Sequence, residues 1–179
     1  MTAPGPSTPA IRTATAGDAA ACRAVYAPYV RDTTVTFETE VPPVEEFAHR
    51  ITRALERYAW LVAEVDGRVA GYAYAGPVKE RAAYAWSCEV SVYVDPAARG
   101  LGLGRALYGE LFARLEQRGF RRLVAVVALP NEPSLALHRT HGFREAGRLG
   151  RIGFKHGRWL DVAWLQRDLG TGDPLAPPR

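Results

Sequence analysis

Hydrophobic residues follow two different periods along the chain, and each period predicts a different element. Two N-terminal segments, one beginning at Thr15 and one at Pro43, carry apolar residues every three to four positions. This spacing predicts amphipathic helices, with Pro43 at the first helical position and Asp18 completing a capping box with Thr15. The apolar positions are Ala20, Val25 and Tyr29 in the first segment and Phe47, Ile51, Leu55 and Tyr58 in the second.

The period then changes to two, which is typical of strands. Asp66-Gly67 predicts a two-residue hairpin, and His156-Gly157 predicts a second turn near the C-terminus. Two further helices are expected, one through 106–115 that stops at Gly119 and a short one over 134–141. The predicted strands are 11–13, 60–65, 68–75, 88–94, 122–129, 143–152 and 159–166.

This order of elements predicts one mixed α/β domain. A chain of 179 residues buries enough surface to need no disulfide or metal. Residues 1–9 and 170–179 are rich in Pro, Gly, Ser and Thr and lack an apolar period, so they are predicted to be disordered tails. The domain is therefore expected to span 10–169.

Composition narrows the function classes. Cys22 and Cys88 form no CxxC pair, which excludes a cysteine-rich zinc fold and suits a reducing compartment, so we expect no metal and a cytoplasmic protein. The longest apolar runs are strand-sized and no secretory signal is visible, so no membrane partner is expected. The net charge of +4 includes an arginine cluster at 118–122, but that cluster lies at a predicted helix end, so no nucleic-acid partner is expected either.

Three alternating glycines, Gly100, Gly102 and Gly104, lie between a predicted strand and a predicted helix. Glycine allows tight turns and close backbone approach, so such a loop can hold a phosphate or pyrophosphate at the helix N-terminus. The spacing does not fit a Walker A loop, which needs Lys and then Ser or Thr where Arg105 and Ala106 stand. It also does not fit a dinucleotide fingerprint, because the chain lacks the third small residue and the acidic residue that this fingerprint requires.

The pattern Arg99-x-x-Gly102-x-Gly104, after a strand and before a helix, resembles the pyrophosphate-binding motif of the GNAT superfamily of acyl-CoA N-acyltransferases. Four stretches are similar to phosphinothricin N-acetyltransferases and their relatives acting on methionine sulfoximine and methionine sulfone. The resemblance implies the GNAT fold, with a central mixed, mostly antiparallel sheet and about four helices, and also a homodimer. The four stretches are GPVKERAAY (76–84), CEVSVYVDP (88–96), ALPNEPSLALH (128–138) and GFKHGRWLDVAWLQRDL (153–169).

The resemblance also implies that acetyl-CoA is the cosubstrate. Its pyrophosphate would bind backbone amides of the glycine loop, and its pantetheine arm would lie along the preceding strand like an added strand. Backbone N–H groups of 90–92 would polarise the thioester carbonyl. The implied cofactor-binding residues are Val92, Tyr93, Val94, Arg99, Gly100, Leu101, Gly102, Leu103, Gly104, Arg105, Asn131 and Thr140.

Acetyl transfer to an amine needs a base, and Glu89 is the expected catalytic base. It is the acidic residue inside the strand 88–94, where partial burial would raise its pKa, and the resemblance implies a catalytic carboxylate at this position. His138 matches a histidine that faces the reaction centre in similar enzymes, where it would assist the base or donate a proton late. Many GNAT enzymes carry a tyrosine acid on this helix, but none occurs between Asn131 and Gly142, so the acid stays unassigned.

The implied substrate is a small, amino-acid-like molecule with an anionic end. Arginine suits tetrahedral oxyanions because its planar fork donates two hydrogen bonds. Ser91 stands where some similar enzymes carry threonine, which leaves the preferred substrate open. The predicted substrate-binding residues are Lys79, Arg81 and Tyr84 for the anionic end, Phe37 as a pocket wall, Lys155 from the last hairpin, and Ser91.

Several alternatives stay open at this point. Cys88 next to Glu89 would allow an acetyl-cysteine intermediate, although strand alternation places it on the opposite face, so direct transfer in a ternary complex is expected. An enzyme acting on a protein N-terminus or another amine is a second possibility, but the cations at 79 and 81 argue against a polyamine. A non-catalytic acyl-CoA-binding protein and a nucleic-acid module are the alternatives outside enzymes.

Overall fold

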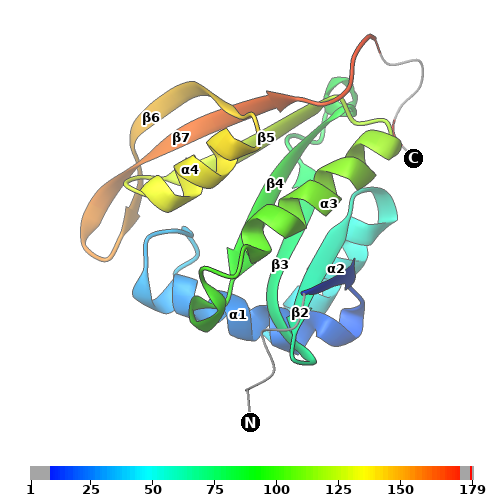
Figure 1. The fold of residues 1–179 in the computed structure, drawn as a ribbon. Helices are drawn as coiled ribbons and strands as arrows, with labels where there is room; N and C mark the ends of the chain where they lie inside the picture. Colours follow the sequence, from blue (N-terminus) through cyan, green and yellow to red (C-terminus); the bar gives the residue numbers. More distant parts are fainter. Residues whose placement is uncertain (1–8, 174–177, 179) are drawn as a thin grey trace.

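The computed structural model describes residues 9–173 and residue 178. In this part of the chain, seven strands form one sheet in the spatial order β1-β2-β3-β4-β5-β7-β6, with four α-helices packed on it (Figure 1). The predicted mixed α/β fold with a mostly antiparallel sheet is confirmed. The strands are β1 (Ala10–Thr13), β2 (Trp60–Val65), β3 (Arg68–Pro77), β4 (Ser87–Val94), β5 (Arg122–Ala128), β6 (Arg144–Lys155) and β7 (Arg158–Asp168), and the α-helices are α1 (Ala19–Asp32), α2 (Val44–Arg57), α3 (Leu103–Gln117) and α4 (Glu132–Thr140).

The hydrophobic core has two parts, one on each face of the sheet. On one face, α3 buries a leucine row against β2 to β5, and on the other face α1 and α2 pack on β2 and β3 (Figure 1). The side chains of β4 point alternately to the two faces of the sheet. Cys88 and Val90 are buried against α3, whereas Glu89 and Ser91 point to the other face. The leucine row consists of Leu103, Leu107, Leu111 and Leu115.

Short-range signals set several element boundaries. Asp66-Gly67 and His156-Gly157 form the two expected hairpin turns, with positive φ at all four residues. Pro43 is the residue before α2 and not its first residue as predicted, so α2 begins at Val44. α4 begins two residues earlier than predicted, because the Asn131 side chain caps it by accepting a hydrogen bond from the Ser134 N–H at 3.3 Å. The last two strands extend beyond the predicted ranges.

The parallel strands β4 and β5 pair along a short stretch and then diverge (Figure 1). Their register covers Ser87–Arg122, Cys88–Leu123 and Glu89–Val124. Beyond Glu89, β4 continues beside β3, and β5 continues beside β7 as far as Ala128. The sheet is therefore open between the C-terminal halves of β4 and β5.

The loop between α1 and α2 and the tip of the β6–β7 hairpin meet beside this opening. Lys155 Nζ donates a hydrogen bond to the Thr36 carbonyl at 2.9 Å, and Arg158 donates one to Thr34 Oγ1 at 3.3 Å. The Phe37 ring lies so close to Gly153 that a Cβ there would overlap the ring. These contacts connect the two halves of the sheet across the opening.

The predicted tails at 1–9 and 170–179 lie largely outside the described residues, so the domain limits stay a prediction. Within residues 9–173 and 178, none of the helices has the length and apolar character required to cross a bilayer.

Arg12 of β1 binds Asp18 and Glu64. Because Asp18 is ionised in this arrangement, the stability of the fold is expected to depend on pH. The Arg12 guanidinium donates to Asp18 at 2.7 and 2.8 Å and to Glu64 at 2.6 Å, and the bonds to Asp18 lower the pKa of that carboxyl to about 2. An acid whose pKa is lowered by folding stabilises the fold above its ordinary pKa of about 4 and loses that contribution as the pH falls toward 2.

We therefore expect Asp18→Asn to lower the free energy of unfolding by about 1–2 kcal/mol at pH 6, with the difference shrinking toward zero near pH 2. Urea unfolding of both proteins across this range measures it. A difference that is equal at every pH would contradict the role given to the ionised carboxylate.

Candidate active site

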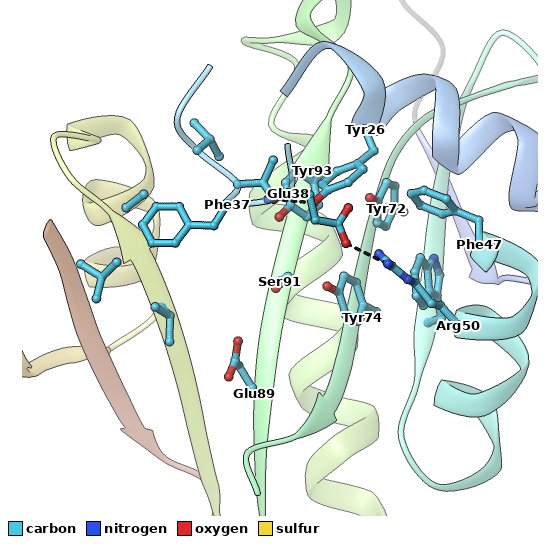
Figure 2. A pocket seen from close by; sticks show the side chains of 16 residues that line it. Tyr26, Phe37, Glu38, Phe47, Arg50, Tyr72, Tyr74, Glu89, Ser91 and Tyr93 are labelled. Atoms are coloured by element: carbon cyan, nitrogen blue, oxygen red, sulfur yellow. Dashed lines mark hydrogen bonds and ion pairs between the residues drawn. The ribbon is translucent and has the colours of Figure 1, made fainter. Parts of the chain in front are cut away.

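A cavity of about 490 Å³ lies beside β4, on the face that carries α1 and α2 (Figure 2). Glu89 and Ser91 enter it from β4, Tyr72 and Tyr74 line it from β3, and Phe37 lines it from the α1–α2 loop. The volume suits a small molecule such as an amino acid derivative. The remaining lining residues are Tyr26, Val35, Thr36, Glu38, Phe47, Arg50, Trp60, Tyr93, Val126, Ala128 and Val162.

Glu89 occupies the point where β4 and β5 separate, since it belongs to their last residue pair. Burial raises the pKa of its carboxyl, and the positive charge of Lys79 opposes this with a smaller effect. A carboxylate with a raised pKa holds a proton more strongly and is a better base at neutral pH. Glu89 is therefore a half-buried carboxylate at the junction of the two strands, and its role as a base stays a prediction.

The glycine loop forms a second cavity, of about 640 Å³, at the N-terminus of α3. Gly100 and Gly102 have φ of +84° and +74°, which favours glycine, and the space where a Cβ would stand is open at both. The helix N-terminus and two arginines make this cavity suitable for an anion such as a diphosphate. Its lining includes nine predicted cofactor-binding residues: Val92, Val94, Arg99, Gly100, Gly102, Leu103, Gly104, Arg105 and Asn131.

A third, small cavity of about 50 Å³ fills the opening between β4 and β5. It shares Ser91, Tyr93 and Val126 with the Glu89 cavity, and Val92, Asn131 and Ser134 with the glycine-loop cavity. The three cavities therefore follow one another along β4. The residues present fit acetyl-CoA: its diphosphate at the glycine loop and its acyl end in the opening near Glu89.

His138 lines this small cavity from α4 and is 3% exposed. Its Nδ1 lies 2.7 Å from the Ser134 carbonyl oxygen, and its Nε2 lies 3.0 Å from the hydroxyl of Tyr108. Burial lowers the pKa of the imidazole, the hydrogen bond to the Ser134 carbonyl opposes this with a smaller effect, and nearby His141 lowers the pKa further. The structure therefore places a neutral His138 at the opening, outside the lining of the Glu89 cavity.

The predicted residues for the anionic end of the substrate, Lys79, Arg81 and Tyr84, line a neighbouring cavity of about 400 Å³ between α2 and the segment after β3. This cavity shares Arg50, Trp60 and Tyr74 with the Glu89 cavity. Of the three predicted residues, Lys79 is close enough for its charge to act on Glu89. The structure thus brings them beside the Glu89 cavity and does not make them part of its wall.

Three other predicted residues, Lys155, Leu101 and Thr140, do not line the cavities described above. Lys155 is 4% exposed and holds the Thr36 carbonyl, so its ammonium fixes the loop. Leu101 is 45% exposed, and the Thr140 hydroxyl donates to the Leu137 carbonyl within α4. Tyr93 lines the Glu89 cavity and the small cavity in the opening, but not the glycine-loop cavity.

Two charged residues in the Glu89 cavity were missed by the sequence analysis. Arg50 of α2 binds Glu38 at 2.8 Å and Glu46 at 2.7 Å, and Figure 2 shows the Glu38–Arg50 pair across the cavity from Ser91. Glu46 and Arg50 are four residues apart on a helix, which reads as an ordinary surface pair. Period-two alternation could have found Tyr72 and Tyr74, since it places them on one face of β3.

Comparison with known proteins agrees with this geometry. The chain matches the family described as an acetyltransferase (GNAT) domain over residues 11–164. It is 46% identical to a phosphinothricin N-acetyltransferase of Streptomyces viridochromogenes over 94% of this chain and 92% of that protein. It is 37% identical to an L-methionine sulfoximine/L-methionine sulfone acetyltransferase of Pseudomonas aeruginosa over 89% of this chain and 94% of that protein.

Among solved structures, a GNAT superfamily phosphinothricin acetyltransferase from Sinorhizobium meliloti in complex with acetyl-CoA has a TM-score of 0.90. It is 40% identical in sequence, and the match covers 96% of this chain and 94% of that one. The sequence match, the shared fold and the three connected cavities lead to one conclusion. The chain belongs to the GNAT family and is an N-acetyltransferase.

Proposed function

We propose that this acetyltransferase acetylates the α-amino group of a small amino-acid-like substrate of the phosphinothricin, methionine sulfoximine or methionine sulfone type. The observation that carries the proposal is the position of Glu89, at the junction between an amino-acid-sized cavity and the opening that leads to the glycine loop. Acetyl-CoA supplies the acetyl group when bound, with Arg99, Arg105 and the amides of 100–105 holding its diphosphate.

In the proposed reaction Glu89 removes a proton from the substrate ammonium, which makes the nitrogen a nucleophile. Beyond Glu89, the N–H groups of β4 that point away from β3 have no strand partner in β5, so they are available to polarise the thioester carbonyl. Cys88 is fully buried on the α3 side, and burial raises the pKa of its thiol, which disfavours a thiolate nucleophile. These features support direct transfer in a ternary complex.

Charges around the cavity support a zwitterionic substrate. Glu89 and Glu38 attract the ammonium, while Arg50, Lys79 and Arg81 are cations at or beside the cavity wall that would attract a carboxylate or an oxyanionic end. The aromatic wall of Tyr72, Tyr74 and Tyr93 would pack against the aliphatic part, together with Phe37.

We also propose that the enzyme is a cytoplasmic homodimer without a nucleic-acid or membrane partner. Both cysteines are free thiols, which suits a reducing compartment. The β6–β7 hairpin exposes a group of large apolar side chains, which a second copy of the chain would cover; sedimentation of the purified protein at twice the chain mass would support this. The exposed residues are Leu149, Ile152, Phe154 and Trp159, with Phe37 nearby.

A panel of amines tests the substrate class. We expect free thiol to be released from acetyl-CoA with phosphinothricin, methionine sulfoximine or methionine sulfone. The kcat/KM should be at least about tenfold above that for amino acids with apolar side chains and for a peptide with an apolar N-terminal residue, because these offer the neighbouring cations no polar end. Stronger turnover of the peptide, or silence across the whole panel, would contradict the proposed substrate.

Glu89→Gln tests the base. Because a carboxamide cannot accept the proton, we expect kcat to fall about 10²- to 10³-fold. Since burial raises the pKa of Glu89, the wild-type kcat/KM should decline with falling pH through a pKa above the ordinary glutamate range, and the variant should lack this decline. A rate profile from pH 5 to 9 measures both effects.

Folding provides the control for this variant. A raised acid pKa means that the ionised carboxylate destabilises the fold above that pKa, so Glu89→Gln should melt at the same temperature as the wild type or higher at pH 7. Cys88→Ala is the matched control on the neighbouring residue and should keep near-full kcat. Full turnover by the folded glutamine variant would remove Glu89 from the mechanism.

A further inference from the structure

In the proposed acetyl transfer, on which this inference rests, the leaving sulfur must receive a proton, and no residue has yet been assigned as its donor. The substrate ammonium loses two protons in becoming an amide, and the sulfur gains one as the C–S bond breaks. Glu89 accounts for the first proton, which then passes to water. The helix α4 carries His138 but no tyrosine between Asn131 and Gly142, so the direct donor to sulfur is still to be assigned.

The two hydrogen bonds of His138 fix where its proton lies. A carbonyl oxygen only accepts, so the Nδ1 atom at 2.7 Å from the Ser134 carbonyl carries the hydrogen. In the neutral ring Nε2 is then an acceptor, and the Tyr108 hydroxyl at 3.0 Å donates to it. His138 thus has a strong partner on each nitrogen and a vacant position for one more proton, on Nε2.

Of the two residues, Tyr108 is the one that can still form a further hydrogen bond. Its ring, 1% exposed, stacks on Phe112 and contacts the edge of His141, so its orientation is fixed. Tyr108 lines the small cavity between β4 and β5, together with Ser91 and Asn131. After donating to His138 the phenol oxygen still has lone pairs to accept a hydrogen bond from this cavity. The titratable side chains that act electrostatically on the pair include His141 and, at longer range, Tyr74, Glu89 and Tyr93.

We propose that Tyr108 is a catalytic residue that carries the second proton from the substrate nitrogen to the sulfur, with His138 as the positioning residue that holds the proton between the two steps. In the first step an N–H bond of the attacking nitrogen breaks and an O–H bond forms on Tyr108, while the original phenol proton moves to His138 Nε2. In the second step Nε2 returns that proton to the phenol oxygen, and Tyr108 gives its proton to the sulfur as the C–S bond breaks.

This sequence balances without a further reactant. The imidazolium formed between the steps donates Nδ1–H to Ser134 and Nε2–H to Tyr108, so its charge has two hydrogen-bond partners already in place. Neither residue ends with a changed protonation state. Both residues line the small cavity in the opening and neither lines the Glu89 cavity, which suits a relay between the reacting nitrogen and the sulfur.

Tyr108→Phe keeps the ring and removes the hydroxyl. We expect kcat to fall about 10²-fold or more, with the dissociation constant for acetyl-CoA, measured by calorimetry, unchanged within twofold. His138→Gln should lower kcat similarly, and the double variant should be no slower than the slower single variant, because both substitutions interrupt one relay. His141→Asn, which alters the other histidine against the same ring, is the matched control and should keep near-full kcat.

Nitrogen NMR of the ¹⁵N-histidine-labelled protein gives a readout apart from turnover. His138 should be the neutral Nδ1–H tautomer at pH 7, and its Nε2 resonance should shift in Tyr108→Phe because the donated hydrogen bond is lost. An Nε2–H tautomer would overturn the relay whether or not any amine is acetylated. Wild-type kcat in Tyr108→Phe, or independent losses that multiply in the double variant, would overturn it while leaving the proposed function intact.

Discussion

The active site is built around the separation of β4 from β5 beyond Glu89. Each strand keeps a full antiparallel partner on its outer edge, β3 for β4 and β7 for β5, so the two can diverge after Glu89 without losing their place in the sheet. Backbone groups on the inner edges then lack a strand partner, and such groups in a half-buried position favour a ligand that supplies hydrogen bonds. The opening is therefore both a structural cost and the origin of the binding cleft.

Packing on both faces keeps this opening in place. The buried leucine row of α3 crosses β2, β3 and β4, and the same helix presents its N-terminus and the glycine loop at the open end. On the far side Lys155 and Phe37 join the β6–β7 hairpin to the α1–α2 loop. The core that stabilises the fold thus also fixes the distance between the anion-binding loop, Glu89 and the substrate cavity.

The sequence predicted the parts of this arrangement that depend on local chemistry. Turn dipeptides, helical period and strand alternation located the elements, and alternation alone put Cys88 and Glu89 on opposite faces, as found. The glycine loop was recognisable because positive φ, found at Gly100 and Gly102, favours glycine. The termini of α2 and α4 were misplaced by one or two residues because capping by Pro43 and Asn131 competes with the helical period.

Contacts between segments far apart in the sequence could not be predicted from local sequence patterns. Lys155 was expected at the substrate, yet it binds the carbonyl of a residue 119 positions earlier, which no spacing encodes. Tyr108 was hidden among the apolar positions of α3, and its role emerges only where α3 meets α4. Arg50 likewise read as a surface residue, because its link to Glu38 forms across a loop.

Hydrogen exchange of backbone amides with and without acetyl-CoA tests the central claim, that the opening beyond Glu89 receives the cosubstrate. We predict that amides of 100–105, and those amides of 90–94 that point away from β3, become strongly protected on binding, while amides of β2, which already pair on both edges, do not change. Protection confined to the glycine loop, with the β4 amides exchanging as in the free protein, would contradict the account.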